Sequence, residues 1–330
     1  AGSRISTGGI VLDGGGKGVV ISANNSKPDA FAPPFVTWDG IIFKVTWASA
    51  GKLYLARVSP AGAVLDPGGI LVPGPMSGPT ASTGAGNLQV VWSVLKTNEF
   101  DTLSANVSSN NVAGKNISIG VSAPAHTRSD VAMGSNGAMI AFRSDISGSN
   151  RIMAQPVDLN GQVLTPNPIQ LDAGPTTNGP SAPSVAWNGT LYLVTWGNAS
   201  GIVAQRLNQD GSLVDPLPFV VMPGFGPTEV SAVGNTFLII ARQFLNNNPE
   251  LIIPVVSRVD GSTGTILDPA GFSDGNSFCV SVSLTTVTNR WLAVFEVVWI
   301  FLLFFLVAGS LPPDVGESHY LPKARHYWQP

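Results

Sequence analysis

One four-segment pattern recurs six times along the chain, at a spacing of about fifty residues. Its clearest copy contains four apolar runs separated by turns, at 184–187, 191–196, 202–207 and 212–221. The first two runs flank Asn188-Gly189, and Asn-Gly between apolar runs is the strongest short-range signal of a β-hairpin. Each copy is therefore predicted to be a four-stranded antiparallel sheet.

Repetition of such a sheet at this period is typical of a β-propeller. A pair of β-sandwiches does not need six copies of one motif, and the coils of a β-helix are much shorter than fifty residues. The composition agrees, because Gly (37) and Pro (26) are abundant and only 11 % of the residues are charged. We therefore predict an all-β, six-bladed β-propeller of four-stranded antiparallel blades.

The beginning of the chain indicates how the ring closes. Arg4–Asp13 matches Arg57–Asp66, which is the third strand and fourth segment of the first complete copy. The missing first two strands appear at the other end of the chain, at 277–283 and 290–295. We predict that N- and C-terminal strands together close the last blade, which removes an open sheet edge. The domains are then a propeller at 1–296 and a non-repeat tail at 297–330.

The repeat Pro-x-Val-Ala-Trp-Asn-Gly at 183–189, with Leu-Val-x-Trp, Ala-x-Arg and Asp-Gly after it, resembles bacterial secreted and surface β-propeller repeat proteins. The resemblance covers residues 4–296 and implies the fold, but it carries no family chemistry. It also implies an extracellular or cell-surface location. The start at Ala1-Gly2-Ser3 is similar to a mature N-terminus, and the low charge agrees with that location.

Two further sequence features concern the predicted extracellular location, the Asn-x-Ser/Thr triplets and the single cysteine. Candidate N-glycosylation sites are Asn24, Asn106, Asn116, Asn188 and Asn198. Cys279 stands alone, so the chain has no intrachain disulfide, and its apolar neighbours favour a buried strand position.

Nucleic acid, metals and cofactors are not expected. The net charge is −3, and the 17 Lys and Arg residues are spread along the chain. The three histidines, His126, His319 and His326, lack a second histidine at metal-ligand spacing. The segments around Asp158 and Asp210 lack the further oxygen ligands of a Ca²⁺ loop, which favours turns. We predict no cofactor.

The carboxylates fall into two groups. Four of them recur at one repeat position and are predicted to accept backbone N–H groups of the following turn: Asp13, Asp66, Asp215 and Asp268. Six others break the repeat without forming a recognisable acid/base pair in sequence: Glu99, Asp101, Asp130, Asp145, Glu229 and Glu250.

Tryptophans also recur at strand ends, at Trp38, Trp47, Trp92, Trp187 and Trp196. Repeated aromatic residues of a propeller pack between blades, and this is the reading we favour. The alternative is that they stack against sugars on one face of the ring.

The tail differs from the repeats. Residues 297–309 form one uninterrupted run of uncharged residues. We predict an assembly strand whose apolar positions are Val297, Trp299, Phe301, Leu303, Phe305 and Val307. A membrane span through 291–309 is an alternative, although the apolar run is short for one. A sequence error at the end of the gene is the third.

These observations predict a non-enzymatic extracellular structural or adhesive protein. A more specific form of this prediction is a filament subunit whose partners are copies of itself, joined head to tail through residues 297–330. The alternatives are a lectin-like propeller that binds cell-surface glycans and a membrane-anchored surface protein. A hydrolase built on the repeat-breaking carboxylates is a further alternative.

Overall fold

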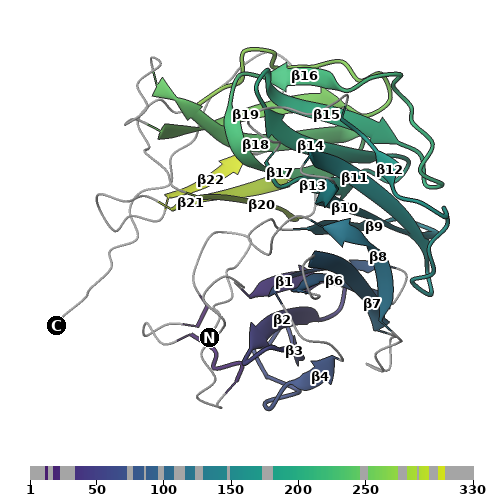
Figure 1. Ribbon diagram of the computed structural model, residues 1–330. Coiled ribbons are helices and arrows are strands. Elements are labelled where there is room, and N and C mark those ends of the chain that lie inside the picture. The colour runs from purple at the N-terminus through teal and green to yellow at the C-terminus, as the bar shows by residue number, and fades with distance from the viewer. Residues whose placement is uncertain are drawn as a thin grey trace.

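A computed structural model describes most of the repeat region (Figure 1). The described residues are 12–13, 18–22, 34–72, 77–84, 87–95, 100–107, 116–122, 129–146, 149–172, 181–245, 252–273, 281–287, 290–296 and 304–308.

The described strands form six antiparallel sheets, which we name blades 1 to 6 in chain order. Blade 1 contains β1 (Phe35–Trp38), β2 (Phe43–Ser49), β3 (Lys52–Val58) and β4 (Ile70–Val72). Blade 2 contains β5 (Ser77–Gly84), β6 (Asn87–Leu95), β7 (Phe100–Val107) and β8 (Ile117–Ser122). Blade 3 contains β9 (Asp130–Met133), β10 (Gly137–Ile146), β11 (Ser149–Asp158) and β12 (Ile169–Gln170).

The second half of the chain continues the same order. Blade 4 contains β13 (Ser184–Trp187), β14 (Tyr192–Asn198), β15 (Gly201–Leu207) and β16 (Phe219–Met222). Blade 5 contains β17 (Phe225–Val233), β18 (Thr236–Phe244) and β19 (Ile252–Asp260). Blade 6 contains β20 (Ser281–Val287), β21 (Arg290–Glu296) and β22 (Phe304–Ala308). The all-β propeller prediction is confirmed.

Side-chain oxygens build the hairpin turns between first and second strands. In blade 4, Oδ1 of Asn188 accepts hydrogen bonds from the N–H groups of Thr190 and Leu191, at 2.9 and 2.8 Å. Asp39 does the same in blade 1. The glycine that follows each of them has a positive φ, 100° at Gly189 and 96° at Gly40, which a side chain would strain. Hairpin turns therefore form at the predicted Asn-Gly and Asp-Gly positions. They are wider than a two-residue Asn-Gly turn, because four residues separate the paired strand ends Trp187↔Tyr192 and Trp38↔Phe43.

The first strand of each blade lies beside the first strand of the next, from β1 through β5, β9, β13 and β17 to β20 (Figure 1). Because strands within a blade are antiparallel, every blade has two ends. We call the end where the first strands begin the A end. The B end carries the turns from first to second strands and from third strands to fourth segments.

The core consists of apolar layers between neighbouring blades, since alternate residues of each strand face opposite neighbours. Met139 and Ala141 of blade 3 pack against Tyr192, Val194 and Trp196 of blade 4. The intervening residues of blade 3, Ile140 and Phe142, instead pack with Val91 of blade 2. Blade 3 therefore buries both of its faces, as a propeller requires.

The tryptophans confirm the packing interpretation in part. Trp47, Trp92 and Trp196 are buried, and Trp187 packs at the border of the layer between blades 3 and 4. Trp38 is the exception, with 43 % of its surface exposed at the B end.

Blade 6 departs from the predicted closure. The strand that pairs with the outer edge of β21 is β22, from the tail, in the register Trp291↔Ala308 to Phe295↔Phe304. We expected residues from the N-terminal segment Arg4–Asp13 at this edge, and 4–11 lie outside the described residues. The physical reason for the difference is that β22 offers an unbroken apolar strand, Phe-Phe-Leu-Val-Ala, close to β21 along the chain.

Candidate functional site

A repeated arginine–aspartate pair stabilises the B end. In blade 1, Oδ2 of Asp66 accepts hydrogen bonds from the backbone N–H and Nε of Arg57, at 3.0 and 2.8 Å, and Oδ1 accepts from Nη2 at 2.9 Å. Blade 5 repeats this geometry with Arg258 and Asp268. The recurring aspartates do accept backbone N–H groups, but from the preceding third strand and not from the following turn as predicted.

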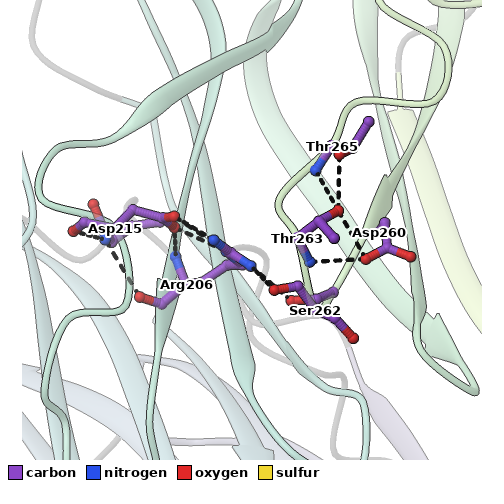
Figure 2. A network of polar contacts seen from close by, with 8 residues as sticks. Arg206, Asp215, Asp260, Ser262, Thr263 and Thr265 are labelled. Carbon is purple, nitrogen blue, oxygen red and sulfur yellow. Dashed lines mark hydrogen bonds and ion pairs between the residues drawn. The ribbon is translucent and has the colours of Figure 1, made fainter.

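In blade 4 the same pair extends to the next blade (Figure 2). Arg206 binds Asp215 through Nε and Nη2, while its Nη1 donates to the carbonyl oxygens of Gly261 and Ser262 at 2.9 and 2.6 Å. Both carbonyls belong to the turn after β19 of blade 5. Arg206 therefore connects two blades, and its side chain is only 7 % exposed.

The pair in blade 1 predicts a specific pH dependence. Hydrogen bonds from the Arg57 side chain hold the pKa of Asp66 below its usual value, and they outweigh the opposing effect of burial. Since the pKa is lowered on folding, Asp66 stabilises the fold above the unfolded pKa, about 4, and this stabilisation is lost as pH falls through the lower folded value.

We therefore expect the difference in unfolding free energy between wild type and Asp66→Asn to be constant above about pH 5 and to shrink below about pH 4. Urea denaturation at a series of pH values measures this difference. A difference that stays constant down to pH 2 would contradict the assignment.

The remaining described carboxylates of the B end hold turns. Oδ1 of Asp158 accepts the N–H groups of Asn160 and Gln162, and Oδ1 of Asp210 accepts the N–H of Ser212. Asp260 caps the turn at Thr263 in the same way. The turn reading of Asp158 and Asp210 is therefore confirmed, and the B-end carboxylates have structural partners.

The repeat-breaking carboxylates lie at the opposite end. Described carboxylates whose positions fall at the A end are Asp101, Asp130, Asp145, Asp172, Glu229 and Glu296. Asp101 lies near the start of β7, and its two carboxylate oxygens accept the O–H of Ser118 at 2.9 and 3.0 Å. Glu99 and Glu250 lie outside the described residues. The fold thus places the described recurring acidic residues at the B end and the described repeat-breaking ones at the A end. The sequence alone could only classify them as recurring or not.

Asp130 anchors a polar connection across three first strands. Its Oδ2 accepts hydrogen bonds from Oγ of Ser184 and from the backbone N–H of Val185, both in the neighbouring blade 4 and both at 2.9 Å. Ser184 Oγ in turn accepts the N–H of Val230 in blade 5 at 3.2 Å. The carboxylate is therefore fixed in position. Ser184 is a residue that the sequence analysis did not single out, since a serine at a strand start carries no signal.

Glu229 occupies the register in blade 5 that Asp130 occupies in blade 3. Asp130 pairs with Ala141 and Glu229 with Ile240, which are equivalent positions of the second strands. On the same sheet, Phe225 and Phe244 stack with ring centroids 4.1 Å apart. Phe244 is 37 % exposed, so the A end of blade 5 presents an aromatic surface on the sheet that carries Glu229.

Asp172 follows β12 at the A end of blade 3. Burial raises its pKa, and the hydrogen bond from Ile152 and the charge of Arg151 only partly oppose that shift. A carboxyl group with a raised pKa is the type of group that serves as a proton donor in enzymes. The sequence analysis missed Asp172, because only its burial distinguishes it.

The predicted assembly residues are mostly outside the described residues, which include only Phe305 and Val307 of that set. Both lie in β22, which pairs with β21 of the same chain. The membrane alternative for 291–309 also remains a prediction, and its described parts are strands β21 and β22. Among the described residues, the structure contains no helix long and apolar enough to cross a membrane.

The candidate glycosylation sites differ in their surroundings. Nδ2 of Asn106 donates to the carbonyl of Leu159, and Nδ2 of Asn188 donates to Asn235. Asn116 is exposed, and Asn198 caps a turn through Oδ1. Asn24 lies outside the described residues, and occupancy of all five sites stays a prediction.

Cys279 and the histidines, His126, His319 and His326, also lie outside the described residues. Within the part of the chain that the structure describes, no group of His, Cys, Asp and Glu side chains is arranged to hold a metal ion.

The comparisons with known proteins give a fold but no family. No family model matches the chain. No curated protein matches it either. Solved structures do match, among them that of YjhT, which is 11 % identical over 87 % of this chain and 97 % of its own, with a TM-score of 0.51.

Two further matches are enzymes. A GH43_1 enzyme from Xanthomonas citri is 12 % identical over 73 % of this chain and 93 % of its own, with a TM-score of 0.42. A GH62 α-L-arabinofuranosidase catalytic domain from Coprinopsis cinerea is 13 % identical over 67 % and 84 %, with a TM-score of 0.40.

At these identities the likeness shows the fold alone. The matches nevertheless contradict the premise of our prediction of a non-enzymatic structural or adhesive protein and of a filament subunit. That prediction treated the repeat as a fold without chemistry, whereas the matched solved structures include enzymes. What the sequence, the sheets and these matches establish together is that the chain is an all-β protein of the β-propeller fold.

Proposed function

We propose that this propeller is a carbohydrate-active hydrolase whose site is at the A end. The observation that carries the proposal is the division of the described carboxylates. Those at the B end recur with the repeat and hold arginines or turns, whereas Asp130 and Glu229 break the repeat at equivalent registers of two first strands. Hydrolysis of a glycosidic bond needs two carboxyl groups that flank the bond.

The surroundings of Glu229 support a sugar as the ligand. The stacked pair Phe225 and Phe244 lies on the same sheet, and Arg242 lies over the Phe225 ring at 5.4 Å from its centroid. Exposed aromatic faces provide the apolar contact that sugar rings need, beside polar groups that bind their hydroxyls. In this proposal Glu229 donates a proton to the glycosidic oxygen as the bond between that oxygen and the anomeric carbon breaks, and water adds to the carbon and returns a proton to Glu229. Asp130 holds the inner strands and supplies negative charge.

A secreted or cell-surface location fits this role, and glycans are then the partners. The low charged fraction and the resemblance to bacterial secreted propeller repeats support that location. Polysaccharides outside the cell are substrates that such a protein would meet.

The test is release of reducing sugar from a panel of arabinan, arabinoxylan, xylan and cellulose. We expect activity in the wild type and a loss of at least tenfold in Glu229→Gln, which removes the proton-transferring group with little change in size. Asp210→Asn is the matched control, because it removes an acidic charge at the B end. Binding without sugar release by the wild type on the whole panel would contradict the hydrolase proposal.

A further inference from the structure

Four Asn-Gly pairs occur in the chain, and at each of them the side chain can react with the main chain. The glycine nitrogen attacks the side-chain carbonyl carbon of the asparagine, and glycine permits this approach because it has no Cβ. Hydrogen bonds that hold the asparagine amide or the attacking N–H oppose the reaction. The structure describes three of the pairs, at 136–137, 160–161 and 188–189, while 178–179 lies outside the described residues.

Asn188 of blade 4 is held by its side chain. Its Oδ1 accepts the N–H groups of Thr190 and Leu191 at 2.9 and 2.8 Å, and its Nδ2 donates to Oδ1 of Asn235 at 3.3 Å. All three hydrogen bonds must break before the side chain can turn toward the nitrogen of Gly189. Since one net hydrogen bond slows such a step about fivefold, three of them slow it about a hundredfold.

Asn160 of blade 3 is held at the attacking nitrogen instead. The side chain of Asn160 is exposed and makes no hydrogen bond with a residue that the structure describes. The N–H of Gly161, however, donates to the carbonyl oxygen of Asp158 at 2.9 Å. One hydrogen bond therefore opposes the reaction, and we expect it to be about five times slower than at a pair without one.

Asn136 lies in a four-residue hairpin turn of blade 3 that corresponds to the turn of Asn188 in blade 4. The turn in blade 3 begins with Gly134, which has no side chain, so it lacks a counterpart of the cap that Asn188 provides. Asn136 is exposed, and among the described residues its side chain has no hydrogen-bond partner. Its amide is therefore not held.

The attacking nitrogen of Gly137 is not held either. Its carbonyl oxygen accepts the N–H of Gly134 at 2.7 Å, without the reverse hydrogen bond. Asp158, its register partner in β11, directs both of its backbone groups to the turn that follows it. Within the described part of the chain, Asn136-Gly137 is thus the Asn-Gly pair in which neither reacting group is hydrogen-bonded.

We propose that Asn136-Gly137 is a site of spontaneous modification, where the asparagine becomes aspartate or isoaspartate. The nitrogen of Gly137 forms a bond with Cγ of Asn136 and gives its proton to water, while the bond from Cγ to Nδ2 breaks and ammonia leaves. Water then opens the cyclic imide at either carbonyl. One opening gives an aspartate, and the other leaves the main chain longer by a carbon atom. The proposal does not depend on the proposed carbohydrate function.

The longer main chain would act on the contact between blades 3 and 4. The backbone N–H of Asn136 donates to Oε1 of Gln209 in blade 4 at 3.2 Å. The carbonyl oxygen of Gly137 accepts from the hydroxyl of Tyr192, a buried residue of blade 4, also at 3.2 Å. Because the new bond lies between these two groups, isoaspartate at position 136 is expected to loosen the contact and to lower the thermal midpoint.

The experiment is peptide mapping by mass spectrometry of the full chain, incubated in warm, mildly alkaline buffer with and without urea. In the folded protein we expect Asn136 to lose its amide about five times faster than Asn160 and about a hundred times faster than Asn188. In urea the three rates should converge, because unfolding removes the hydrogen bonds that separate them.

Two variants test the cause. Asn136→Gln should keep its thermal midpoint during the incubation while that of the wild type falls, because the longer side chain closes the corresponding ring with difficulty. Asn235→Ala removes one hydrogen bond from Asn188 and should raise the rate there about fivefold, with no change at Asn136.

Equal rates at the three asparagines of the folded protein, or a fastest rate at Asn160 or Asn188, would overturn the proposal. An Asn136 that reacts in urea but not in the folded protein would overturn it as well. None of these outcomes bears on sugar release, so they leave the hydrolase proposal to its own test.

Discussion

Replacing Arg206 with methionine is expected to lower the free energy of unfolding by about 3–5 kcal/mol. The side chain is nearly buried, and its loss leaves the carbonyl oxygens of Gly261 and Ser262 without their donor. The carboxylate of Asp215 then keeps the backbone N–H of residue 206 but loses the charged guanidinium. Methionine retains most of the apolar stem, so the effect reports the lost hydrogen bonds and charge. Urea denaturation followed by circular dichroism gives the measurement.

Arg57→Met is the matched control for this change. Arg57 makes the same bidentate contact with its aspartate, but its side chain is 32 % exposed. Water replaces part of the lost interaction there, and we expect a loss of about 1 kcal/mol or less. Equal destabilisation by the two variants would contradict the role of Arg206 as a connection between blades 4 and 5.

Replacing Trp92 with alanine is expected to cost about 3–5 kcal/mol. The indole is fully buried in the layer between blades 1 and 2, where it packs with Leu53, Leu55 and Val90. Alanine removes these contacts and leaves a cavity that two rigid sheets cannot close. Trp92→Phe should be milder, because the indole Nε1 has no hydrogen-bond partner in the described part of the chain.

Trp38→Ala is the control for the aromatic position. Trp38 belongs to the same repeated set, but it is the exposed member and packs mainly on Phe43, with centroids 4.6 Å apart. We expect a loss of about 1 kcal/mol, measured by the same denaturation experiment. A loss at Trp38 that equals the loss at Trp92 would contradict the account of which tryptophans form the core.

Local sequence signals predicted the hairpins and therefore the blades. The Asn188-Gly189 turn and the alternating apolar runs around it require no information from distant residues. The recurrence of that unit then predicted the propeller, since one blade cannot bury its two faces alone. These parts of the structure agree with the sequence because their causes are local or repeated.

The Arg–Asp pairs were within reach of the sequence but were missed. Arginine recurs at Arg57, Arg206 and Arg258, each about nine or ten residues before its aspartate. We predicted a structural role only for the aspartates, and we predicted the wrong backbone N–H groups as their hydrogen-bond donors. The signal in the sequence was that an arginine and an aspartate recur together at a fixed spacing. The third strand and the fourth segment of a blade then bring the two side chains into contact.

The candidate site depends on information that the sequence does not contain. Asp130 and Glu229 are about a hundred residues apart, and only the shared register of β9 and β17 shows that they are equivalent. Asp172 is distinguished by its burial, which belongs to the folded chain. The pairing of β22 with β21 likewise depends on which strand reaches the open edge, and the repeat pattern alone favoured the N-terminal segment.

The central claim is that the described acidic residues of the B end are structural, whereas the A end carries the functional carboxylate Glu229 together with Asp130, which also holds the first strands. Its most direct test compares Asp130→Asn/Glu229→Gln with Asp210→Asn/Asp260→Asn, in initial rates of reducing-sugar release on the most active polysaccharide of the panel. The account predicts at least a tenfold loss for the A-end variant and an unchanged rate for the B-end variant, with both folded at the assay temperature. Equal rates in the two variants, or a loss confined to the B-end variant, would contradict it.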